Sequence, residues 1–190
     1  NSILTDSTTI TGSNNKTNIV TSSIINGSNN EIDNSNYTSV NGLNNTISFS
    51  HKSFITGSDH NEMSGEANAI FGKENNNVGS DNSIISGRLN NMNNINQTII
   101  NGKSNIGVNI EHSNINGLNN NISDVSGIIV GGELNTISNN ASNSVIWGTS
   151  NTITGNDEDS IKNNIFVGNN NSISQNTKQT LIIGDNNNSS

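Results

Sequence analysis

Glycine recurs at a fixed interval along this chain, and that interval constrains the fold more than any other feature of the sequence. Twelve glycines occupy the same place of one recurring motif: Gly12, Gly27, Gly42, Gly57, Gly72, Gly87, Gly102, Gly117, Gly132, Gly148, Gly168 and Gly184. The first nine stand fifteen residues apart without interruption. So short a period predicts an array of small coils, in which each coil packs only against its neighbours.

The composition by itself is typical of a disordered chain. Only 28% of the 190 residues are hydrophobic and 3% are aromatic. A chain with so little apolar surface normally cannot offset the conformational entropy lost on folding. A solenoid can do so, because it places its few apolar residues at the same inward position of every coil. The repeat therefore predicts an ordered fold.

Two places in each coil carry recurring apolar residues. The first aliphatic column, two residues before the glycine, is apolar in all twelve coils, for example at Ile25 and Phe166. The second aliphatic column stands five residues after the glycine: Ile32, Ile47, Met92, Ile122, Ile137, Ile153 and Ile173. Where it fails, Met63, Val78 and Val108 stand one place later. We expect all of these side chains to face inward.

Polar residues recur as regularly as apolar ones. Asparagine stands three residues after the glycine in eleven of the twelve coils, and His60 replaces it in the remaining coil, that of Gly57. Glycine and asparagine tolerate a positive φ, so Gly-x-x-Asn predicts a tight turn, and stacked asparagines can form a ladder. A small polar residue four places before the glycine marks the start of a strand in every coil except that of Ile128.

These columns predict an all-β fold. Fifteen residues accommodate two strands of about five residues each with their turns, and no helical period is present. The expected architecture is a parallel β-roll, a two-sided solenoid of about twelve coils. We treat 1–190 as one domain, with regular repeats over 1–139 and less regular coils with an acidic insertion over 140–190.

The residues three and one before the glycine alternate with the first aliphatic column and should face outward. Many are apolar: Ile24, Phe54, Ile84, Ile99, Ile129, Val145, Ile165 and Leu181, then Phe71, Trp147, Val167 and Ile183. With only one inward residue expected on each strand, the roll buries little by itself. An apolar outer face on such a roll predicts self-association.

Three segments resemble a known family. Residues 144–148 (Ser-Val-Ile-Trp-Gly), 83–87 (Ser-Ile-Ile-Ser-Gly) and 39–42 (Ser-Val-Asn-Gly) resemble the Ser-Val-Ala-Ile-Gly repeat in the heads of YadA-type trimeric autotransporter adhesins. The resemblance extends over essentially the whole chain. One difference is that the family usually has a small residue two places before the glycine, where this chain has an aliphatic or aromatic one.

The resemblance implies a left-handed β-roll assembled as a homotrimer about a common axis. It also implies a role in cell adhesion and virulence, through binding to host cell-surface receptors or extracellular matrix. The expected location is the bacterial cell surface, where a stalk and an anchor outside this sequence attach the head to the outer membrane.

Charge and residue content argue against several other functions. Seven basic residues against fifteen acidic ones leave no basic surface for nucleic acid or anionic membranes. No segment has the ~20 apolar residues that span a bilayer, so we expect no direct membrane insertion. His51, His60 and His112 share no metal-ligand spacing, and Arg88 is the single arginine. We expect no enzyme activity, no cofactor and no metal.

Candidate binding residues stand outside the recurring columns. Tyr37 and Phe49 are expected in connections between strands, and exposed aromatic side chains commonly anchor interfaces. The aromatic residues at strand places are assigned instead to the core or the trimer axis: Phe54, Phe71, Trp147 and Phe166.

A second candidate is the acidic insertion at 155–160. After Gly132 the spacing becomes 16, 20 and 16 residues, and the longest gap holds Asp157, Glu158 and Asp159. This loop should protrude from the roll. It can bind a cation or a basic partner, or it can simply be solvated.

Other functions remain open alongside the adhesin head. The roll can be a structural spacer in a surface fibre, or a segment of a phage tail fibre, which is also trimeric and β-rich. An ice-binding solenoid needs a flat face of repeated threonines, but Thr11 and Thr56 share a column that is mostly asparagine in other coils.

Overall fold

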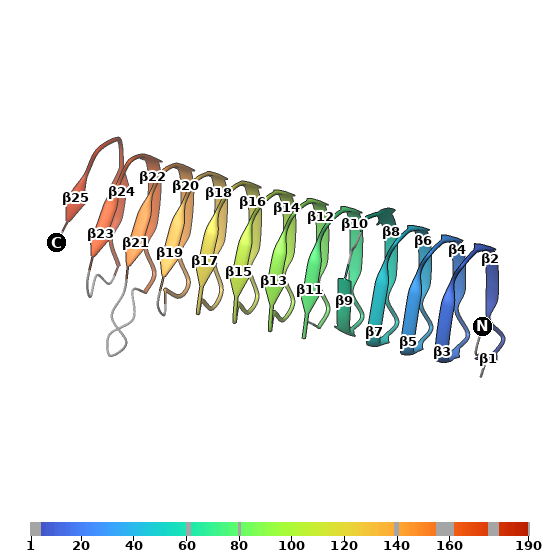
Figure 1. Ribbon diagram of the computed structural model, residues 1–190. Helices are drawn as coiled ribbons and strands as arrows, with labels where there is room; N and C mark the ends of the chain where they lie inside the picture. Colours follow the sequence, from blue (N-terminus) through green and yellow to red (C-terminus); the bar gives the residue numbers. More distant parts are fainter. Residues whose placement is uncertain are drawn as a thin grey trace. The chain divides into compact units, whose positions relative to one another are not determined.

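The computed structural model describes residues 5–59, 62–79, 81–138, 141–154, 162–174 and 179–189. Over these residues the protein is an all-β parallel β-solenoid without a helix (Figure 1), as the repeat predicts. The described residues accordingly offer no helix that could cross a membrane. The chain divides into two compact units, Asn1–Met92 and Asn93–Ser190, and each is described by itself.

In the first unit, every coil contributes one strand to each of two parallel sheets. The sheet with the repeat glycines contains β2 (Thr9–Ser13), β4 (Ile24–Ser28), β6 (Ser39–Leu43), β8 (Phe54–Ser58), β10 (Ala69–Lys73) and β12 (Ile84–Arg88). The opposite sheet contains β1 (Thr5–Asp6), β3 (Lys16–Thr21), β5 (Glu31–Asn36), β7 (Thr46–His51), β9 (Glu62–Glu66) and β11 (Asn76–Val78). Strand β13 (Asn91–Asn93) contains the boundary between the units.

The second unit repeats this arrangement. Its glycine-bearing strands are β14 (Ile99–Lys103), β16 (Asn114–Leu118), β18 (Ile129–Glu133), β20 (Val145–Thr149), β22 (Ile165–Asn169) and β24 (Leu181–Ile183). The opposite strands are β15 (Ile106–Val108), β17 (Asn121–Ser123), β19 (Thr136–Ser138), β21 (Thr152–Thr154), β23 (Ser172–Ser174) and β25 (Asn188–Ser189).

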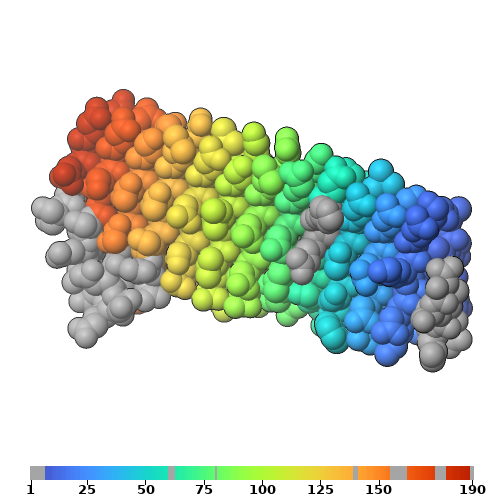
Figure 2. Space-filling model, viewed as in Figure 1, coloured from blue at the N-terminus to red at the C-terminus, as the bar shows by residue number. Residues whose placement is uncertain are grey.

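Within each unit, strands pair in register with the equivalent strand of the next coil, apart from one shift of register between β7 and β9. Glycine pairs with glycine, and Ile115 of the first aliphatic column pairs with Val130. The register also continues across the 20-residue gap, because Ile146 pairs with Phe166. Within each unit, neighbouring coils are in direct contact on the face that Figure 2 shows. Extra length between strands therefore leaves the stacking of the coils unchanged.

The core contains more columns than the sequence predicted. The first aliphatic column is buried from Ile25 to Phe166, and the second is buried at all seven of its predicted members, as predicted. The terminal members of the first column, Ile10 and Ile182, are not fully buried. A third buried column stands eight residues after the glycine, or nine in the 16-residue coil of Gly132: Val20, Ser35, Ser50, Ile95, Ile110, Val125 and Ala141.

The prediction of one inward residue on each strand was too low for β3, β5 and β7. It holds for β13, β15, β17 and β19, where the third column follows the strand. Each of these coils therefore buries more than the two residues expected.

The third column exists because the chain bends between two inward residues. The residue seven places after the glycine has a positive φ, for example 48° at Ile19 and 47° at Asp124. This backbone conformation interrupts the alternation of inward and outward side chains, so two consecutive residues, such as Asn18 and Ile19, both face outward.

Of the three second-column residues that stand one place later in the sequence, only one faces inward as predicted. Met63 is fully buried, whereas Val78 and Val108 face outward. In those two coils the inward place is held by Asn77, which pairs with Met63, and by Gly107, which pairs with Ile122. In-register pairing fixes the inward place, even where the residue that occupies it is polar or has no side chain.

Asparagines three places after the glycine form the predicted ladder. The Asn120 amide nitrogen donates to Asn105 Oδ1 and to the Gly132 carbonyl, both at 3.0 Å. Its Oδ1 accepts from the backbone nitrogen and the Nδ2 of Asn135, at 3.1 and 3.0 Å. Since Asn120 is fully buried, these bonds satisfy polar groups that water cannot reach.

The Gly-x-x-Asn turn is present as predicted, but the asparagine is not one of its residues with a positive φ. The glycine has a positive φ, 135° at Gly117, and so does the residue two places after it, 53° at Asn119. The ladder asparagine, one place further, has no positive φ. The repeat therefore requires asparagine there for the hydrogen bonds of its amide and not for its backbone conformation. A Cβ on Gly117 would overlap the Gly132 carbonyl oxygen of the next coil, which explains the fixed glycine.

Removing one ladder amide should destabilise the solenoid. Asn120→Ala leaves the buried backbone N–H of Asn135 without its acceptor, and an unpaired buried group costs about 1–3 kcal/mol. We expect urea unfolding to show a loss of at least this size. Asn121→Ala, at an exposed neighbouring position, is the matched control, and equal stability of the two variants would contradict the role of the ladder.

Replacing the buried Asn77 by an apolar residue should stabilise the solenoid. Asn77 is fully buried, and neither its Nδ2 nor its Oδ1 has a hydrogen-bond partner among the described residues. Asn77→Val removes two unpaired polar atoms and restores an apolar inward residue, so the free energy of unfolding should rise by about 1–3 kcal/mol. Asn91→Val, at an exposed place of β13, is the control; a less stable Asn77→Val protein would contradict the assignment.

Candidate functional site

The predicted site residues differ in where the structure places them. Tyr37 is 64% exposed in the bend after β5, as predicted, and has a φ of 57°. Phe49 is 67% exposed, but it lies inside β7 and not in a connection, because β7 continues through the bend at this residue. Asp157, Glu158 and Asp159 lie outside the described residues.

The other aromatic residues also separate into groups. Phe166 is buried, which confirms its assignment to the core, and Phe54 is partly buried against Phe71, with ring centroids 5.5 Å apart. Phe71 and Trp147 are 41% and 55% exposed, so they do not lie in the core, and their alternative assignment to the trimer axis stays a prediction. They occupy outward places of the glycine-bearing strands.

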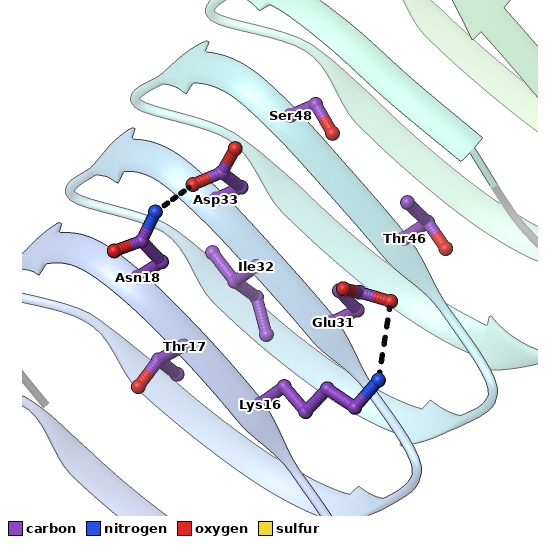
Figure 3. A pocket seen from close by; sticks show the side chains of 8 residues that line it. All are labelled: Lys16, Thr17, Asn18, Glu31, Ile32, Asp33, Thr46 and Ser48. Carbon is purple, nitrogen blue, oxygen red and sulfur yellow. Dashed lines mark hydrogen bonds and ion pairs between the residues drawn. The ribbon is translucent and has the colours of Figure 1, made fainter. Parts of the chain in front are cut away.

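A hollow of about 510 Å³ lies on the outer face of β3, β5 and β7 (Figure 3). It is lined by Lys16, Thr17, Asn18, Glu31, Ile32, Asp33, Thr46 and Ser48. Since the three strands pair in register, each outward place presents one side chain from every strand. We call it the polar hollow.

Two contacts organise the side chains of the polar hollow. Asn18 Nδ2 donates to Asp33 Oδ1 at 2.7 Å, and Lys16 Nζ lies 4.0 Å from Glu31 Oε2. Figure 3 shows these pairs at two ends of the hollow, with Thr46 and Ser48 on the third strand. The hollow therefore presents carboxylates, an amide and hydroxyls, with one more negative charge than positive.

A second hollow, of about 400 Å³, follows along the same three strands. It is lined by Ile19, Asn34, Asn36, Phe49 and His51. Three of these are the direct sequence neighbours of residues that line the polar hollow. We call it the aromatic hollow, since the exposed Phe49 ring belongs to it. The Tyr37 side chain lines neither of the two hollows.

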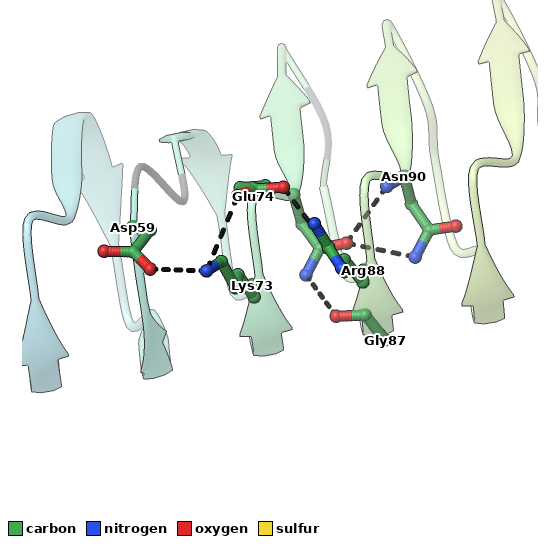
Figure 4. A network of polar contacts seen from close by, with 7 residues as sticks. Asp59, Lys73, Glu74, Gly87, Arg88 and Asn90 are labelled. Atoms are coloured by element: carbon green, nitrogen blue, oxygen red, sulfur yellow. Dashed lines mark hydrogen bonds and ion pairs between the residues drawn. The ribbon is translucent and has the colours of Figure 1, made fainter.

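Charged side chains form a separate network in the first unit (Figure 4). Lys73 Nζ lies 2.7 Å from Asp59 Oδ2 and 3.7 Å from Glu74 Oε1, and Arg88 Nε lies 3.4 Å from Glu74 Oε2. The hydrogen bond and charge of Asp59 raise the pKa of Lys73 above 10.5. Exposed pairs of this kind stabilise a fold little, and they leave both cations neutralised by carboxylates.

The second unit carries an apolar outer face on β18, β20, β22 and β24. Two rows pair in register across these strands: Ile129, Val145, Ile165 and Leu181, then Gly131, Trp147, Val167 and Ile183. The outward direction predicted for these columns is confirmed, with Trp147 55% and Ile183 70% exposed. The six-membered ring of Trp147 covers Gly131, where a Cβ would overlap it. We call these residues the apolar face.

Known proteins supply no further argument for this site. Neither a scan against protein-family models nor a search of curated proteins found a match to the chain. Over the described ranges, no group of three or more His, Cys, Asp or Glu residues could hold a metal ion. What the two hollows offer chemically is hydrogen bonding beside an exposed aromatic ring.

Sequence reasoning found Phe49 but missed the polar residues beside it. Lys16, Glu31 and Asp33 occupy outward places of two successive coils, where most other coils have asparagine, threonine or serine. A charge at an otherwise uncharged outward place was the available signal. Charge was considered only in the acidic insertion at 155–160 and not within the regular coils.

Proposed function

We propose that this chain is the head region of a bacterial surface adhesin that binds host cell-surface receptors or extracellular matrix. The observation that carries the proposal is the pair of hollows on β3, β5 and β7, where side chains outside the recurring columns gather beside the exposed Phe49. The recurring residues are committed to folding, because they face inward. The non-recurring outer residues are therefore available for recognition.

The proposed assembly is a homotrimer of left-handed rolls, joined through the apolar face. Soluble monomers rarely expose a large contiguous apolar patch, and the seven apolar side chains of this face lie on four adjacent strands. Three copies of a weak site give avidity without a deep pocket. In this proposal a stalk and an anchor display the trimer on the outer membrane, as the motif resemblance implies.

A structural spacer is the alternative, favoured by the regular register of the coils. Both functions are compatible with a trimer, so assembly alone does not separate them. Attachment does, because a spacer holds another binding domain away from the membrane and binds nothing itself.

Attachment should depend on the two hollows. We expect beads coated with the chain to adhere to host cells or matrix proteins, and the double variant Asp33→Ala/Phe49→Ala to reduce adhesion by about tenfold or more. Leu134→Ala, at a residue 49% exposed in the second unit, is the control. Wild-type beads that bind no cell or matrix protein would favour the spacer.

Assembly should depend on the apolar face. We expect the wild-type chain to scatter light as a trimer, and Ile165→Lys/Val167→Lys to be a folded monomer, because buried ammonium groups at the interface are costly. Trp147 is the only tryptophan, so its emission should shift to longer wavelength in the variant. Asn121→Lys, on the opposite sheet, should stay trimeric; a monomeric, folded wild-type protein would contradict the assembly.

A further inference from the structure

We propose that the polar and aromatic hollows together form a carbohydrate-binding groove for a neutral oligosaccharide that crosses β3, β5 and β7. The inference rests on the proposed adhesive function and names its ligand class. Its basis is the combination, on one outer surface, of planar polar groups, hydroxyls and an exposed aromatic ring.

The polar groups match the hydroxyls of a sugar. Asp33 lines the hollow and is held by Asn18 through one carboxylate oxygen, at 2.7 Å, so its second oxygen can accept from a sugar hydroxyl. Figure 3 draws no hydrogen bond between Thr46 or Ser48 and another residue that lines the polar hollow. A hydroxyl both donates and accepts, so these groups can pair with either role of a ligand hydroxyl.

Phe49 supplies the apolar part of the recognition. Its ring is 67% exposed, and the positive φ of 52° places the residue in the bend where side chains face outward. The C–H face of a pyranose ring is apolar and packs on aromatic rings, so it would cover surface that Phe49 leaves in water. An exposed phenylalanine beside hydrogen-bonding groups is the combination that orients such a ligand.

The register of the strands gives the groove a suitable spacing. Equivalent side chains on neighbouring parallel strands stand about 4.8 Å apart, which is close to the advance of one ring along an extended oligosaccharide. An oligosaccharide laid across the strands meets Asn18, Asp33 and Ser48 in turn. The hollows of about 510 and 400 Å³ are open to solvent, so a ligand would lie across them with one side in water.

Charge selects among saccharides. Glu31 and Asp33 outnumber Lys16, whose ammonium group lies 4.0 Å from Glu31, so sulfated or sialylated chains meet net repulsion. A peptide ligand is less suited, because Ile32, the one large apolar residue that lines the polar hollow, has its side chain buried in the core. A neutral saccharide uses the hydrogen-bonding groups without needing an opposite charge.

The test uses the whole chain on an array of neutral, sialylated and sulfated oligosaccharides, followed by titration calorimetry with the best neutral one. We expect preference for neutral chains, and Asp33→Ala and Phe49→Ala each to weaken binding about tenfold or more. Tyr37→Ala is the matched control, since it removes an equally exposed aromatic ring outside both hollows. Unchanged thermal unfolding verifies that each variant is folded.

Three results would overturn the inference. The first is binding to sulfated or sialylated chains in preference to neutral ones, and the second is unchanged affinity in Phe49→Ala and Asp33→Ala. The third is attachment of wild-type beads to host cells with no oligosaccharide bound, which would leave the adhesive function intact and make its receptor a protein. Beads that attach to nothing would instead overturn the adhesive function itself.

Discussion

In-register stacking through the asparagine ladder is the interaction on which the rest of this structure depends. Each buried amide bridges two neighbouring coils, donating to one and accepting from the other, as Asn120 does with Asn105 and Asn135. Asparagine suits the position because one short side chain carries both a donor and an acceptor. The ladder and the fixed glycine reinforce the backbone pairing that sets the register of neighbouring coils.

That stacking separates folding from recognition. Inward places carry the same kind of residue in almost every coil, and they satisfy one another along the array. Outward places carry no such requirement, so side chains of different kinds can gather across adjacent strands. The polar hollow of the first unit and the apolar face of the second unit both consist of such outward side chains. The first suits a hydrated ligand, and the second suits another copy of this chain.

The solenoid tolerates defects because its register is set by backbone pairing. Asn77 and Gly107 hold inward places that are aliphatic elsewhere, yet their strands stay in register. Longer gaps are accommodated in the same way, since Ile146 and Phe166 remain paired across twenty residues. A local change therefore costs stability in one coil and leaves the columns on either side in place.

The sequence by itself determined the period, the two sheets, the first aliphatic column and the ladder, because in-register coils give every repeated residue the same environment. It did not reveal the third buried column, the inward Asn77 or the strand position of Phe49. The third column and the place of Phe49 within β7 depend on the positive φ seven residues after the glycine, as at Ile19 and Asp124, which breaks simple alternation. The inward place of Asn77 depends on its pairing with Met63. The hollows needed the tertiary structure, since only lateral pairing of three strands brings Asn18, Asp33 and Ser48 together.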